Sequence, residues 1–72
     1  MPASVRISVR GMTCGHCRSR VEEALRAVRG VYSVSVDLAG GSADVDFDDG
    51  KTNPAALVEA IRAVGYEAEA PQ

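Results

Sequence analysis

Two cysteines, three positions apart, carry the clearest chemical potential in this sequence. Cys14 and Cys17 lie in the segment Gly-Met-Thr-Cys-Gly-His-Cys, which spans residues 11–17. In a reducing compartment this spacing is typical of metal binding or redox chemistry. A structural disulfide is disfavoured, because closing so short a loop constrains little of the unfolded chain.

The available ligands favour a soft metal ion over a hard one. A structural zinc site needs four ligands, whereas this chain offers two cysteines and one histidine, His16. The loop has neither paired histidines nor an acidic cluster at ligand spacing. Thiolates select Cu(I), which accepts two ligands in a near-linear arrangement. We therefore expect one Cu(I) held by Cys14 and Cys17.

Hydrophobic periodicity predicts the elements that position this loop. Alternating apolar residues indicate strands, and apolar residues at helical spacing indicate two helices, the second beginning at Asn53-Pro54 with a capping side chain and a favourable first-turn proline. The resulting order βαββαβ is the α+β, ferredoxin-like arrangement, a four-stranded antiparallel sheet with both helices on one face. The expected strands are 5–10, 32–38, 43–48 and 67–70, and the expected helices run from about 18 to a cap at Gly30 and from 53 to a cap at Gly65.

The same patterns assign side chains to the core and to the surface. Tyr32 and Phe47 are expected in the core, and Val64 belongs to the buried stripe of the second helix. The aspartates at alternate positions of the third strand indicate a solvated sheet face rather than a cation site. Cys14 is expected in the loop and Cys17 in or just before the first helical turn, where free N–H groups and a partial positive charge favour thiolate over thiol.

Length and charge exclude several classes of function. The 72 residues suffice for one domain, 1–72, with a modest core and little room for a deep substrate pocket, so we do not expect an enzyme. A net charge of −2 argues against nucleic-acid binding. The sequence has neither a signal peptide nor an apolar run near the roughly 20 residues that span a bilayer, which predicts a cytoplasmic protein without membrane insertion.

The charges are distributed unevenly along the chain. Residues 1–30 hold six arginines against two glutamates, whereas residues 31–72 hold two basic residues against eight acidic ones. Arg10 precedes the cysteine motif, and Arg18 and Arg20 follow it. These arginines are either ordinary surface charge or a basic rim that steers an acidic partner surface towards the loop.

The chain resembles the heavy-metal-associated domain family, which includes bacterial copper chaperones and the N-terminal domains of copper-exporting P-type ATPases. The resemblance is carried by GMTCGHC at 11–17, the βαββαβ order, and Gly65-Tyr66 after the second helix. It implies a cytosolic metallochaperone that passes Cu(I) by thiolate exchange to the metal-binding domain of a copper-exporting P-type ATPase, or to the site where ions enter that transporter.

The resemblance also implies roles for single residues. Cys14 and Cys17 match the metal-binding cysteines, and Met12 matches a methionine that packs under the loop. Thr13 stands where zinc-transporting relatives often have aspartate. His16 is either an exposed residue or one that tunes the site, because imidazole can change its charge near neutral pH. Tyr66 is either a partly buried ring or a contact that orients the cysteine loop.

Four alternatives stay open. The chain could be the N-terminal domain of such an ATPase, it could carry Hg(II), or its metal could bridge a homodimer. The tetrapeptide Cys-Gly-His-Cys also occurs in thiol-disulfide oxidoreductases, but that fold needs about 100 residues, a tryptophan before the motif and a facing cis-proline. This chain has no tryptophan, and Pro54 already starts a helix.

Overall fold

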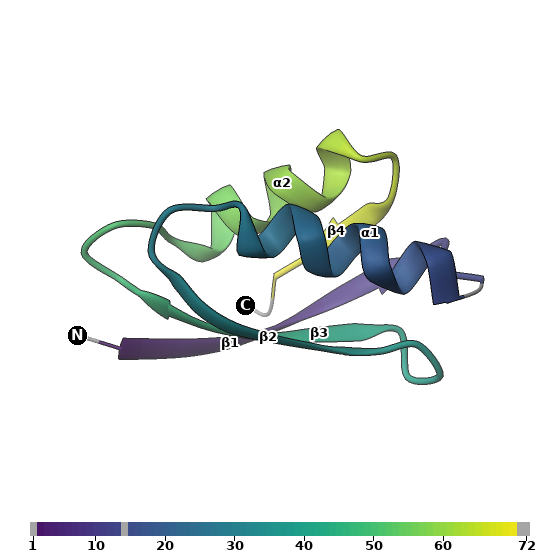
Figure 1. Cartoon of the computed structure of the whole chain (residues 1–72), viewed down its shortest axis with the longest axis horizontal. Coiled ribbons are helices and arrows are strands. Elements are labelled where there is room, and N and C mark those ends of the chain that lie inside the picture. The colour runs from purple at the N-terminus through teal and green to yellow at the C-terminus, as the bar shows by residue number, and fades with distance from the viewer. Residues whose placement is uncertain (1, 14, 71–72) are drawn as a thin grey trace.

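Six elements follow one another in the predicted order βαββαβ. The computed structural model describes residues 2–13 and 15–70, so Cys14 lies outside the described residues. The elements are β1 (Pro2–Arg10), α1 (Gly15–Arg26), β2 (Val31–Asp37), β3 (Ser42–Asp48), α2 (Pro54–Ala63) and β4 (Glu67–Glu69). They form one antiparallel four-stranded sheet in the order β2-β3-β1-β4, with both helices on one face (Figure 1). The predicted ferredoxin-like fold is confirmed.

The core lies between the helices and the inner face of the sheet. Phe47 of β3 is 3% exposed, as the alternation predicts, and it belongs to one cluster with residues from both helices. The largest fully buried side chains come from every layer: Ile7, Val21, Leu25, Val45, Leu57 and Ile61. Burying such side chains contributes about 1.5–3 kcal/mol each, so this interface holds the helices against the sheet.

The outer face of the sheet is polar, as predicted. Asp46 accepts hydrogen bonds from the hydroxyls of Ser4, at 2.6 Å, and Ser33, at 2.7 Å. These contacts link three neighbouring strands and lower the pKa of the Asp46 carboxyl, the Ser4 bond having the larger effect. In the neighbouring cross-strand pair on the same face, Arg6 Nε lies 2.9 Å from Asp44 Oδ1. The aspartates therefore stabilise strand pairing on the exposed face.

Both ends of α1 differ from the prediction. The helix begins at Gly15, about three residues early, so His16 and Cys17 lie inside its first turn. It ends at Arg26, and Gly30 is not its cap. Gly30 instead belongs to the connection before β2, where its carbonyl accepts the Asp48 N–H at 2.7 Å. The start of α2 is confirmed, because Asn53 Oδ1 accepts the Ala56 N–H at 2.9 Å.

Two predicted core residues are on the surface. Tyr32 is 60% exposed because the β2–β3 register shifts between Val31 and Ser33, which leaves Tyr32 as the extra residue of a bulge. Val64 is 37% exposed because it follows the last turn of α2 as the C-cap. Gly65 follows with a φ of 98°, and its N–H donates to the Arg62 carbonyl, which confirms the predicted helix end.

Candidate metal site

The cysteine motif begins where β1 ends, in the loop 11–13 between the sheet and α1. Three connections meet at this end of the molecule. The β2–β3 turn and the α2–β4 turn lie at the same end of the molecule as this loop (Figure 1). The Val9 N–H donates to the carbonyl of Gly41 in the first turn, and the ring of Tyr66 in the second lies close to Gly11. The fold therefore presents the motif at one end of the sheet, supported by two neighbouring turns.

Gly11 is required by the path of the backbone. Its φ is 95°, a conformation that residues with a side chain rarely adopt. A Cβ at this position would lie 3.5 Å from Cδ1 of Tyr66, so the aromatic ring lies close to Gly11. Met12 follows, half-buried and packed against the core. Met12 thus anchors the loop in the core, and the Tyr66 ring lies close to the first residue of the loop.

Cys17 is the third residue of α1 and is half-buried. The first N–H groups of a helix have no partner within the helix, and they carry a partial positive charge that favours a thiolate. The hydroxyl Oγ1 of Thr13 lies 3.9 Å from the Cys17 sulfur, within hydrogen-bonding range for sulfur. Cys14 lies outside the described residues, so the described half of the predicted ligand pair is Cys17.

His16 is exposed, on the helix rather than in the loop. Within residues 2–13 and 15–70 the structure gives His16 neither a hydrogen bond nor an ion pair. Its imidazole is therefore accessible to solvent beside the Cys17 turn. The two interpretations of His16, exposed residue or tuning residue, are both compatible with this position.

The three arginines of the predicted basic rim are all exposed. Arg18 and Arg20 are two residues apart on α1, so their directions differ by about 200° around the helix axis. Arg10 ends β1 and stands opposite Glu67 of β4. Arg18 and Arg20 therefore place positive charge on two sides of α1 near the motif. At the end of β1, by contrast, the positive charge of Arg10 stands opposite the negative charge of Glu67.

Sequence reasoning offered a contact with the cysteine loop as one of two roles for Tyr66, but it did not identify Gly11 as the neighbour of the ring. The two residues are far apart in the sequence, and only the β1–β4 pairing brings the α2–β4 turn to the loop. The available signals were a glycine after the first strand and Gly65-Tyr66 after the second helix. Among the described residues no three His, Cys, Asp or Glu side chains converge on a common point. In the same part of the chain, neither helix is long and apolar enough to cross a membrane.

Comparisons with known proteins agree with this geometry. A profile of the heavy-metal-associated domain family matches residues 6–67. Copper chaperone CopZ of Staphylococcus aureus (strain JH9) is 43% identical over 61 residues, which span 85% of this chain and 90% of CopZ. A copper binding domain from HMA7, a P-type ATPase, superimposes with a TM-score of 0.94 at 39% identity, covering 100% of this chain and 96% of that one. Oxidised MerP from Ralstonia metallidurans CH34 gives 0.94 at 38% identity, with both chains fully covered.

Proposed function

The chain belongs to the heavy-metal-associated domain family, and from that premise we propose that it is a single-domain cytoplasmic carrier of Cu(I). Cys14 and Cys17 hold the ion between their sulfur atoms. The observation that supports this most is the position of Cys17 in the first turn of α1, half-buried and in contact with Thr13. A thiolate placed there is stabilised and remains within reach of a partner.

Copper is preferred over zinc on the chemistry of the donors. Two thiolates suit a soft ion of low coordination number, and zinc would require two more ligands. Thr13 supplies a hydroxyl where a carboxylate would favour a harder ion. The relatives named above include a copper chaperone and a copper binding domain of a P-type ATPase. These likenesses support copper as the cargo of this chain.

Transfer is proposed to proceed by exchange of thiolates. A cysteine thiolate of the acceptor adds to the bound ion, one carrier thiolate leaves, and the second leaves when another acceptor thiolate has bound. The ion stays Cu(I) throughout, and each sulfur that departs is free to take a proton from water. The motif suits this exchange because it lies at one end of the sheet, next to the exposed side chains of Thr13 and His16.

The proposed acceptor is the cytosolic metal-binding domain of a copper-exporting P-type ATPase. The exposed Arg18 and Arg20 would favour an acidic surface around the acceptor cysteines. The function proposed is carriage without catalysis. The ferredoxin-like fold counts against the thiol oxidoreductase alternative, which requires a longer chain and a different arrangement of elements.

A transfer assay tests the proposal. The Cu(I)-loaded protein is mixed anaerobically with the metal-free N-terminal metal-binding domain of a copper-exporting P-type ATPase, and the two are separated for copper analysis. We expect copper to equilibrate between the two proteins within the mixing time. A small-molecule chelator, used as the reference, should remove copper from the carrier more slowly. If copper leaves only as fast as it does to the chelator alone, the carrier function is wrong.

A further inference from the structure

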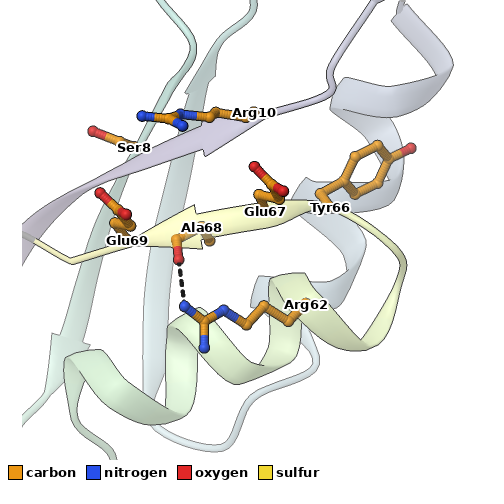
Figure 2. A pocket seen from close by; sticks show the side chains of 7 residues that line it. All are labelled: Ser8, Arg10, Arg62, Tyr66, Glu67, Ala68 and Glu69. Atoms are coloured by element: carbon orange, nitrogen blue, oxygen red, sulfur yellow. Dashed lines mark hydrogen bonds between the residues drawn. The ribbon is translucent and has the colours of Figure 1, made fainter.

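A cleft of about 410 Å³ follows the outer edge of β4, the last and shortest strand. Its walls come from both sides of that strand. Glu67 and Glu69 line it with Ser8 and Arg10 on the polar face of the sheet, and Arg62 of α2 lines it on the helix side (Figure 2). Because both faces of β4 contribute, the cleft runs along the strand edge and not over one face.

Backbone groups of β4 point into this cleft. In an antiparallel pair, opposite residues exchange either both hydrogen bonds or neither. Val9 stands opposite Ala68, but its N–H donates to the Gly41 carbonyl at 2.8 Å, on the other side of β1. The Val9–Ala68 pair is therefore the kind without hydrogen bonds. It follows that the N–H and C=O of Ala68 point outwards, towards the free edge.

Arg62 covers part of that edge. Its Nη2 donates to the outward Ala68 carbonyl at 3.1 Å (Figure 2). Covering an exposed strand edge with a side chain from a neighbouring element is one way in which proteins prevent unwanted strand pairing. The Arg62 side chain is 53% exposed and its ion pair with Glu59 is long, at 3.7 Å. It can therefore move away from the carbonyl at low cost.

On the polar face of the cleft the two glutamates outnumber Arg10, which stands opposite Glu67, so that face favours a cationic occupant. Glu67 and Glu69 are exposed and, being two residues apart on a strand, they lie on the same face of the sheet. Neither forms an ion pair with any residue in the described part of the chain. On the opposite face of β4, Ala68 is small and 2% exposed. A strand added here would meet carboxylates on one face, whereas on the other face the buried Ala68 leaves room beside it for a small residue only after Arg62 has moved.

We propose that the β4 edge docks an extended segment of a partner protein that carries Lys or Arg at alternate positions, with small apolar residues between them. A partner N–H replaces Arg62 at the Ala68 carbonyl, and a partner carbonyl accepts the Ala68 N–H, which adds a fifth strand to the sheet. The basic side chains pair with Glu67 and Glu69, and the apolar residue faces Ala68. This docking requires no metal and is independent of the copper function.

Titration of the metal-free, reduced full-length protein tests the proposal. The probe is the peptide acetyl-Lys-Val-Lys-Val-Lys-amide at up to millimolar concentration, followed by amide chemical shifts of the isotopically labelled protein. We expect the largest shifts at Glu67–Glu69, slower hydrogen exchange at the Ala68 N–H, and no such changes with the peptide in which Glu replaces Lys. Shifts centred outside β4, or equal binding of the acidic peptide, would overturn the proposal.

Variants with opposite effects separate docking from loss of structure. Glu67→Gln/Glu69→Gln should weaken binding about threefold or more, because two cross-strand charge pairs are removed. The matched control, Glu22→Gln/Glu23→Gln on α1, changes the net charge equally and should leave binding within about twofold. Arg62→Ala should tighten binding by about two- to tenfold, because the competing hydrogen bond is lost. Unchanged or weaker binding by Arg62→Ala would contradict the role of Arg62 as a cover.

Discussion

The Thr13 hydroxyl oxygen lies 3.9 Å from the Cys17 sulfur, across the start of α1. This contact joins the loop that follows β1 to the first turn of the helix. It places a neutral polar group beside the proposed metal ligand, at a position where a carboxylate would bring negative charge. The contact orients the sulfur and can stabilise its charged form, so it connects the local structure to metal affinity.

Removing the Thr13 hydroxyl should weaken Cu(I) binding. We expect Thr13→Val to lower affinity by about two- to fivefold, the effect of losing one modest hydrogen bond. Thr13→Ser keeps the hydroxyl and serves as the control, with affinity close to that of the wild type. Both values come from anaerobic competition with a Cu(I) chelator. Equal affinities for the valine and serine variants would show that the contact does not act on the sulfur.

Gly11 and Gly15 flank the two ends of the loop and should respond differently to alanine. Gly11→Ala forces a side chain onto a φ of 95° beside the Tyr66 ring, which should reduce the free energy of unfolding by about 1–2 kcal/mol. Gly15 lies in α1, where an added Cβ would have no neighbour within 4 Å, so Gly15→Ala should be neutral or stabilise by up to about 1 kcal/mol. Urea unfolding of the metal-free, reduced protein measures both. A Gly11→Ala protein as stable as Gly15→Ala would refute this explanation of the loop.

Reversing charge on α1 near the motif should slow transfer to an acidic acceptor. For Arg18→Glu/Arg20→Glu we expect the transfer rate to fall about tenfold at low ionic strength, and by less at physiological salt, where screening is stronger. Arg26→Glu/Arg29→Glu makes the same change in net charge at and beyond the far end of the helix and is the control. Stopped-flow mixing with the acceptor measures the rates. An unchanged rate for the first variant at low salt would remove the steering role.

Asp46 should contribute to loss of stability in acid. Hydrogen bonds from Ser4 and Ser33 lower its pKa in the folded protein below the ordinary value of 3.8. The folded state therefore favours the charged carboxylate, so the stabilisation is present above pH 3.8 and is lost as the pH falls through the lowered folded value. Asp46→Asn, or Ser4→Ala/Ser33→Ala, should flatten the acid limb of a plot of unfolding free energy against pH. A limb as steep as in the wild type would contradict this assignment.

Much of the fold could be predicted because periodicity reports burial directly. Alternation identified the strands around Ile7, Val45 and Phe47, which are all buried in the structure. Sequence patterns failed where the register between paired strands decides which side chains are buried. Tyr32 continues the alternation of β2, but a one-residue shift against β3 turns it outwards, and nothing in its neighbours encodes that shift. The early start of α1 was missed because Gly15 and His16 carry no apolar periodicity.

The positions of some site residues could be predicted from the sequence, whereas the long-range neighbours of the loop could not be fixed. Cys17 lies in the first helical turn as expected, and Met12 packs against the core. By contrast, the position of the Tyr66 ring near Gly11 and the hydrogen bond of Arg62 to Ala68 depend on how α2 and β4 return to the sheet. The spacing of residues does not fix such long-range neighbours: for Tyr66 it left two roles open, and for Arg62 it indicated none.

The most direct test of the copper function is anaerobic titration of the reduced protein with Cu(I) against a competing chelator, in the wild type and in Cys14→Ser/Cys17→Ser. We predict tight binding of about one Cu(I) per chain, weakened by orders of magnitude in the double variant and not matched by Zn(II). Weak binding, or binding that does not change when both cysteines are replaced, would contradict the proposed function.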